Sequence, residues 1–270
     1  MRRKAWIQIS LIGIVWLCLT GCGQTQPLQG ETASPSVETT TQTAGETENE
    51  KSEENITWQE PSQEEQPVVG QTVICEIETG AVFERINGCS YVENEYISLE
   101  ELRYIQVPYY GFDGKSHVGE MIVHRDIAED VAEIFLKLYE ARYPIERMQL
   151  VDDFGADDEA SMEANNTSAF NFRMISGTTK LSNHSYGRAI DVNPFYNPYV
   201  YTGADGEKHC EPAGAEEYID READNPYQID EEDLCYRLFI ERGFSWGGSW
   251  EKRKDYQHFE RMDVDKERNE

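Results

Sequence analysis

Two short polar segments that lie far apart in the chain constrain its fold more than any other feature. The first, residues 182–191, reads Ser-Asn-His-Ser-Tyr-Gly-Arg-Ala-Ile-Asp and offers an imidazole and, seven residues on, a carboxylate. The second, residues 255–260, reads Asp-Tyr-Gln-His-Phe-Glu and offers a carboxylate and an imidazole three residues apart. A fold that uses these side chains together must bring both segments to one place.

The side chains of the two segments match the ligand set of a catalytic zinc site. Such a site takes three protein ligands, often His nitrogens and a carboxylate oxygen, and leaves the fourth position to water. We therefore predict that His184, Asp191 and His258 hold Zn2+. Asp255 is then the predicted general acid/base that takes the proton of the bound water, and Glu260 is the alternative.

The backbone must turn twice for these groups to converge. The first two ligands meet only if the chain between them turns back, and Gly187 permits such a turn. On an extended strand, Asp255 and His258 would point to opposite faces, because they are three positions apart. We therefore predict a bend or bulge near residues 256–257 that directs both side chains to the metal.

The start of the chain has the pattern of an export signal. Residues 2–4 are basic, and an apolar run that is short for a membrane-spanning helix follows from Ala5 to Leu19. The run leads into Leu-Thr-Gly-Cys, which resembles the bacterial lipobox. The resemblance implies a signal peptide at 1–21, lipidation of Cys22 and a lipid anchor on the extracytoplasmic face of the cell membrane. An ordinary signal peptide or an uncleaved anchor is the alternative.

Composition divides the rest of the chain. Residues 22–66 are rich in Ser, Thr, Gln and Glu and poor in large apolar residues. Such a segment buries too little apolar surface to offset its chain entropy, so we expect a disordered acidic tether. We assign residues 67–100 to an N-terminal extension of the domain and 101–265 to the domain itself, which is long enough to bury a core.

The charge balance narrows the choice of partners. The chain has 52 acidic and 24 basic residues and a net charge of −28. Nucleic acid binding needs clustered Lys and Arg, so we exclude a nucleic acid partner. Electrostatic attachment to anionic lipid is disfavoured for the same reason, which leaves the lipid at Cys22 as the membrane contact. We expect a monomer.

Four cysteines lie beyond the signal and lipidation region. An even number in an exported domain permits two disulfides, and Cys75–Cys89 with Cys210–Cys235 is the most local of three pairings. A cysteine metal cluster is disfavoured because the chain has no C-x-x-C pair. The sequence leaves open whether the bridges form.

Apolar patterning predicts short strands and a few helices that do not alternate in βαβ fashion. We expect strands at 73–77, 102–107, 119–124, 148–151 and 189–192, and helices at 127–141, 157–164 and 230–243. Asp126 and Asp230 are the predicted caps of the first and last of these helices. Residues 199–226 are interpreted as a long turn-rich loop. The fold class that follows is α+β, a small antiparallel sheet with flanking helices.

The combined motifs resemble the M15 family of zinc peptidases over roughly residues 100–262. The motifs are Ser182-x-His184-x-x-Gly187-x-Ala189-x-Asp191, Trp246-Gly247-Gly248-x-Trp250 and Asp255-x-x-His258-Phe259, with Ser168–Arg173 ahead of them. That family comprises D-alanyl-D-alanine carboxypeptidases and dipeptidases and L-alanyl-D-glutamate endopeptidases. The resemblance implies the M15 or hedgehog-like fold and the same metal ligands and acid/base as above.

The resemblance also implies how substrate is held. Arg173 would face the substrate carbonyl or a substrate carboxylate. The candidate substrate-binding residues are Ser182, Tyr186, Trp246, Trp250 and Tyr256, although the tryptophans suit a core equally well. The expected partner is a peptidoglycan stem peptide, and the expected activity is that of a D-alanyl-D-alanine carboxypeptidase.

Other functions stay open at this point. An L-alanyl-D-glutamate endopeptidase would use the same chemistry. A non-catalytic, zinc-holding, cell-wall-binding lipoprotein is favoured by Asp255, because much of the family has Glu at that position. A structural lipoprotein with a closed, stabilising metal site is the remaining alternative.

Overall fold

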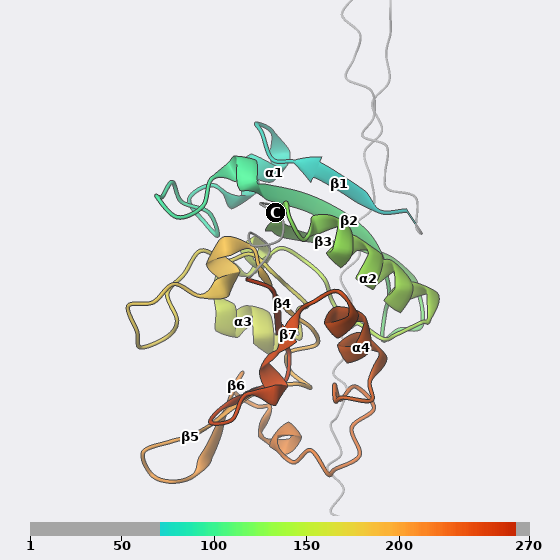
Figure 1. Ribbon diagram of the computed structural model, residues 1–270, viewed down its shortest axis with the longest axis vertical. Coiled ribbons are helices and arrows are strands. Elements are labelled where there is room, and N and C mark those ends of the chain that lie inside the picture. Colours follow the sequence, from blue (N-terminus) through green and yellow to red (C-terminus); the bar gives the residue numbers. More distant parts are fainter. Residues whose placement is uncertain (1–70, 263–270) are drawn as a thin grey trace, which may run out of the picture. The chain divides into compact units, whose positions relative to one another are not determined.

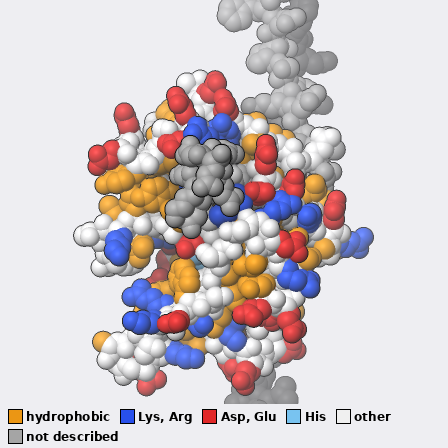
Figure 2. Space-filling model, viewed as in Figure 1, with side chains coloured by type: hydrophobic (Ala, Val, Ile, Leu, Met, Phe, Trp, Pro, Cys, Tyr) orange, Lys and Arg blue, Asp and Glu red, His pale blue; other side chains and the backbone are white. Residues whose placement is uncertain are grey.

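The computed structural model describes residues 71–262, and the fold below refers to these (Figure 1). The expected signal peptide at 1–21, the lipidation site Cys22 and the tether at 22–66 lie outside the described residues. None of the helices in the described part is both long and apolar enough to span a membrane. On the face in Figure 2, acidic and basic side chains are interspersed with hydrophobic ones.

Two of the predicted strands form a long β-hairpin. Strands β2 (Leu102–Tyr110) and β3 (Ser116–His124) pair antiparallel along their whole length, and β1 (Val73–Glu76) adds to the outer edge of β2. The turn closes where the Gly111 N–H donates to the Lys115 carbonyl. Both predicted strand positions are confirmed, and each strand extends further toward the turn than its apolar pattern indicates.

Helix α2 (Ala128–Glu140) packs on this hairpin (Figure 1). Its apolar stripe, at helical spacing in the sequence, is buried: Val131, Ile134, Phe135 and Leu138. Helix α4 (Leu234–Glu241) joins the same core, where Phe239 meets Phe135 edge-on with ring centroids 6.2 Å apart. Burying side chains of this size contributes about 1.5–3 kcal/mol each, so this core is the main source of stability for the domain.

A second antiparallel sheet lies against that core. It has the order β4–β9–β7, from β4 (Ala189–Asp191), β9 (His258–Glu260) and β7 (Ser245–Trp246). In its register Ile190 pairs with Phe259, and both side chains are fully buried. Side chains alternate across a strand, so the neighbouring pair, Asp191 and His258, points to the other face.

A third small sheet corrects the interpretation of residues 199–226 as a turn-rich loop. Strands β5 (Tyr199–Thr202) and β6 (Lys208–Glu211) form a hairpin, and β8 (Lys254–Asp255) pairs with the other edge of β5. The short strands and polar turn residues hid this hairpin from the pattern analysis.

Residues 71–100 belong to the same domain. They contain α1 (Ala81–Ile86), whose Ile86 is fully buried, and they form a second apolar cluster with the outer face of the hairpin. The remaining short elements are η1 (Leu99–Glu101), η2 (Val151–Phe154), α3 (Asp158–Glu163), η3 (Asn183–Tyr186), η4 (Glu216–Ile219) and η5 (Gly247–Ser249). The predicted α+β class is confirmed, with three small sheets in place of one.

Two predicted helix caps are wrong. Helix α2 begins after Ile127 without a side-chain cap, and Asp126 instead accepts a hydrogen bond from Arg188 at 2.9 Å. Helix α4 is capped by Asp233, which accepts a hydrogen bond from the Cys235 N–H at 2.7 Å. Asp230 instead accepts a hydrogen bond from the Glu232 N–H in the turn before the helix. Before α4 the sequence offers four consecutive acidic residues, 230–233, and does not distinguish among them, whereas Asp126 is drawn away from α2 by its pairing with Arg188.

Two further expectations fail. Residues 148–151 form no strand, although the Met148 carbonyl accepts a hydrogen bond from the Glu120 N–H at the edge of β3. All four cysteines of the described part are free thiols. Cys235 is buried in the core on α4, where its neighbours are apolar, and Cys75 is exposed on the edge strand β1. The most local pairing in the sequence is therefore not formed.

Candidate metal centre

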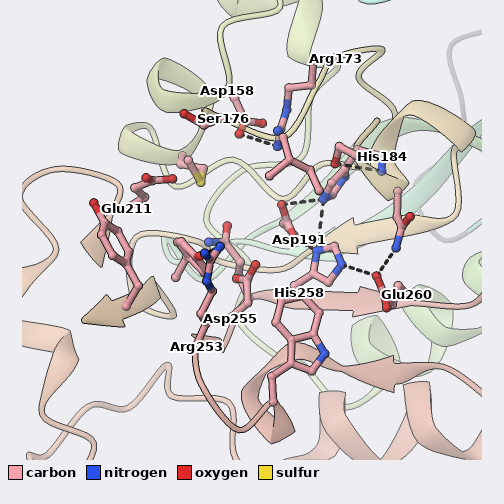
Figure 3. A pocket seen from close by; sticks show the side chains of 18 residues that line it. Asp158, Arg173, Ser176, His184, Asp191, Glu211, Arg253, Asp255, His258 and Glu260 are labelled. Atoms are coloured by element: carbon pink, nitrogen blue, oxygen red, sulfur yellow. Dashed lines mark hydrogen bonds and ion pairs between the residues drawn. The ribbon is translucent and has the colours of Figure 1, made fainter. Parts of the chain in front are cut away.

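The three predicted ligands meet in one buried cluster (Figure 3). His184 Nε2 lies 3.2 Å from Asp191 Oδ2 and 3.2 Å from His258 Nδ1. His258 Nδ1 lies 3.0 Å from Asp191 Oδ1. The β4–β9 register places Asp191 and His258 side by side, and η3 brings His184 to them.

The backbone around His184 explains the motif residues that flank it. Ser182 caps η3, and its Oγ accepts from the His184 N–H at 3.3 Å. Gly187 ends η3 with φ of +64°, and a Cβ there would lie 2.7 Å from the backbone nitrogen of His124. Only glycine fits this turn, as the sequence predicts. The ring Nδ1 of His184 faces the Ala169 carbonyl at 2.6 Å, so it carries the proton and leaves Nε2 as the ligand atom.

The His258 ring is held through its Nε2 atom, whereas the His184 ring is held through Nδ1. His258 Nε2 lies 3.0 Å from Glu260 Oε2, which also accepts a hydrogen bond from the Asn183 amide. The hydrogen bond from His258, aided by the charge of that ring, holds the pKa of Glu260 below its usual range. Glu260 is thus a carboxylate that fixes the ring and leaves Nδ1 for a metal. This pairing favours Asp255 over Glu260 as the acid/base.

The bend predicted near residues 256–257 is present. Strand β8 ends at Asp255 in one sheet, and β9 begins at His258 in another, with bends at the two residues between. Gly247, in the Trp-Gly-Gly motif, packs so closely that a Cβ would lie 2.6 Å from the Asp255 carbonyl oxygen. Because residue 247 is a glycine, η5 can pack directly against the segment that carries Asp255.

Asp255 lies in the same cavity as the cluster. Its Oδ1 is shielded from solvent and has no hydrogen-bond partner within residues 71–262. Burial raises its pKa from the ordinary 3.8 to about 7; the charge of His258 opposes this shift and that of Asp191 adds to it. A carboxyl group that exchanges its proton near neutrality suits general acid/base chemistry.

These groups open into a cavity of about 450 Å3. Of the predicted substrate-binding residues, Ser182 and Trp250 line it, and the Trp250 ring lies 5.5 Å from that of His258. Arg173 also lines the cavity, and its Nη2 pairs with Asp158 at 2.6 Å. Tyr199, Tyr201, Glu211 and Arg253 also line the cavity.

The structure does not place Tyr186, Trp246 or Tyr256 in the cavity wall. Trp246 pairs with the buried Phe259 in the β7–β9 register, so it faces the core, and its Nε1 donates to the Tyr256 carbonyl at 2.9 Å. The Tyr256 ring packs under the Arg221 guanidinium at 4.2 Å. The register that directs Trp246 inward was not visible in the motif.

Several cavity residues escaped the sequence analysis: Asp158, Tyr199, Glu211 and Arg253. Asp158 begins α3, next to the cap Asp157, and appeared only as one acid in a polar helix. Tyr199 and Glu211 lie on the missed β5–β6 hairpin. The alternation of Tyr199 and Tyr201 with Val200 was the signal that could have revealed this strand.

The donor set fits a metal of intermediate softness. Two imidazole nitrogens and one carboxylate oxygen converge, and each imidazole has its second nitrogen bound by another acceptor, Ala169 or Glu260. Zinc is commonly bound by three such ligands with an open fourth position. His184, Asp191 and His258 would hold the ion.

The comparison with known families agrees with this site. A family model described as D-alanyl-D-alanine carboxypeptidase, from the M15 peptidases, matches residues 176–261. The matched segment includes the three candidate ligands and Asp255, and it begins after Arg173. Searches of the curated proteins and of the solved structures each gave no match.

The role of Glu260 can be tested by metal affinity. We expect Glu260→Gln to weaken zinc binding by about 10- to 100-fold, because the His258 ring loses its charged acceptor. Competition with a chromophoric chelator measures this affinity. Glu251→Gln, on an exposed loop, is the control and should leave the affinity unchanged. Equal affinities in all three proteins would show that Glu260 does not position the ligand.

The raised pKa of Asp255 predicts a pH-dependent stability of the metal-free protein. Between pH 4 and 7 the folded state holds the Asp255 proton more tightly than the unfolded state. The contribution of Asp255 to the free energy of unfolding therefore falls as the pH rises, by at most about 1.4 kcal/mol per pH unit. Asp255→Asn removes this loss, so its stability relative to wild type should increase from pH 4 to pH 7. Urea unfolding in the presence of a chelator measures the difference. A difference that does not change with pH would contradict the assignment.

Proposed function

On the match of residues 176–261 to the M15 peptidase family model, we propose that this chain is a zinc-dependent D-alanyl-D-alanine carboxypeptidase that acts on peptidoglycan stem peptides. The observation that carries the proposal is the His184–Asp191–His258 cluster with the unpaired Asp255 carboxyl beside it in one cavity. Structural metal sites rarely keep a proton-exchanging group of this kind next to an open position.

The chain's own residues have distinct tasks in this reaction. When bound, zinc lowers the pKa of its water toward neutrality and polarises the scissile carbonyl. Asp255 accepts the water proton and returns it to the leaving amine. Asp255 needs its carboxylate form for the first step and its protonated form for the second.

Arg173 supplies the cationic end of the cavity. Its guanidinium is held by Asp158, and its Nε is buried without a hydrogen-bond partner in the part of the chain that the structure describes. That unused donor suits the terminal carboxylate of a D-alanyl-D-alanine peptide, or the oxyanion that develops at the carbonyl. We favour the terminal carboxylate, which makes the enzyme a carboxypeptidase rather than an L-alanyl-D-glutamate endopeptidase.

The reaction can be followed by mass spectrometry of a stem pentapeptide incubated with the zinc-loaded protein. We expect loss of the terminal D-alanine, abolished by a chelator and reduced at least about 100-fold by Asp255→Ala, because general acid/base catalysis is lost. Asp224→Ala, at an exposed loop position, is the matched control and should retain full activity.

The other outcomes are distinct. A cut between L-Ala and D-Glu would retain the chemistry and replace the carboxypeptidase by the endopeptidase. An intact peptide in the presence of stoichiometric zinc would refute the enzyme and favour the zinc-holding, cell-wall-binding lipoprotein.

We propose further that a lipid at Cys22 anchors the domain on the extracytoplasmic face of the membrane, where stem peptides lie. The basic start, the short apolar run and the Leu-Thr-Gly-Cys sequence support this location. Metabolic labelling with a radioactive fatty acid in a bacterial host should mark the wild-type chain and leave Cys22→Ser unlabelled. Equal labelling of both would exclude Cys22 as the lipid site.

A further inference from the structure

Three residues of the cavity wall are paired side by side across the three strands of the β6–β5–β8 sheet. Tyr199 on β5 pairs with Glu211 on β6 and, on its other side, with Asp255 on β8. Directly paired residues of antiparallel strands project to the same face of a sheet. All three therefore face the cavity, and all three line it.

This pairing fixes the distance between Glu211 and Asp255, the proposed acid/base. Neighbouring strands lie about 4.8 Å apart, so the Cα atoms of Glu211 and Asp255 are separated by about 10 Å. An extended peptide advances about 3.3 Å per residue. If the scissile bond of an extended substrate lies beside Asp255, the substrate residue two or three positions from that bond therefore lies near Glu211. In Figure 3, Glu211 lies on the opposite side of the cavity from His184 and His258.

The Glu211 carboxylate is unpaired within the described part of the chain. No hydrogen bond or ion pair within residues 71–262 involves its side chain, although it is half-buried. The two guanidinium groups of the cavity are directed elsewhere: Arg173 pairs with Asp158, and Arg253 donates to the Tyr199 hydroxyl at 2.9 Å. Taking a carboxylate partly out of water without a cation costs free energy, which an incoming cation recovers.

We propose that Glu211 is a specificity-determining residue that accepts the side-chain ammonium group of a lysyl or other diamino residue of the substrate. That residue lies two or three positions from the scissile bond on its amino side. The amino side follows from the proposed function, on which this inference rests, because a carboxypeptidase leaves a single residue beyond the scissile bond.

The local charges support a cation at this position. Burial raises the pKa of Glu211, and the neighbouring carboxylates Glu159 and Asp158 raise it further, against the opposing effect of Arg173 and Arg253. The net surroundings of Glu211 are therefore unfavourable to its negative charge. An ammonium group placed there offsets this repulsion and gains a charge-assisted hydrogen bond.

The test compares two peptides that differ in one charge. They are Nα-acetyl-L-Lys-D-Ala-D-Ala and the same peptide with the lysine Nε also acetylated. We expect wild-type zinc-loaded protein to cleave the charged peptide with a kcat/KM about tenfold higher. Glu211→Gln, which keeps the shape of the side chain, should cleave both at the lower rate. Glu207→Gln, in the exposed β5–β6 turn, is the control and should keep the wild-type preference.

A binding measurement separates this inference from the activity. Calorimetric titration of the two peptides into zinc-loaded Asp255→Asn should show the same preference for the charged peptide, lost when Glu211→Gln is added. If wild type cleaves both peptides equally, or Glu211→Gln keeps the preference, the ammonium site is refuted and the carboxypeptidase stands. If neither peptide is cleaved, the carboxypeptidase is refuted, and the binding preference alone decides for or against Glu211.

Discussion

The site depends on the antiparallel pairing of β4 with β9. In this register, Ile190 and Phe259 form one pair that is fully buried in the core, and Asp191 and His258 form the next. A slip of one residue would exchange the faces and place two polar ligands in the apolar core. The burial of Ile190 and Phe259 therefore fixes the position of the two ligands. The core that stabilises the domain and the geometry that prepares the metal site are consequences of the same pairing.

The two histidines of the cluster are fixed by different acceptors. His184 donates to a backbone carbonyl, whereas His258 faces the Glu260 carboxylate, which is itself held by Asn183. A charged acceptor makes the imidazole a better metal ligand, so the two rings are not equivalent. Asn183 precedes His184 in the chain, and Glu260 follows His258. The two motif segments thus bind each other through side chains next to the ligands, in addition to any metal that they share.

Much of the site and less of the fold could be predicted from the sequence. The three ligands and the bend before His258 followed from residue types and spacing, because metal geometry and strand alternation are local rules. The wrong assignments involved choices that only packing decides. Trp246 and Trp250 look alike in the motif, yet only the β7–β9 register shows that Trp246 faces the core. The β5–β6 hairpin was missed because its strands are short and their stabilising partner, β8, lies far along the chain.

The site is built from two sheets joined by a bend of two residues. The β4–β9–β7 sheet carries two of the metal ligands, and the β6–β5–β8 sheet carries Asp255 and Glu211. The chain passes from one to the other through residues 256–257, where the Val192 N–H donates to the Gln257 carbonyl. The distance from Asp255 to the His184–Asp191–His258 cluster is therefore fixed by this bend, while the distance from Asp255 to Glu211 is fixed by the strand spacing. If the proposed function holds, changes in the β5–β6 hairpin would alter which peptide is accepted without moving the metal cluster, because His184, Asp191 and His258 all lie outside this hairpin.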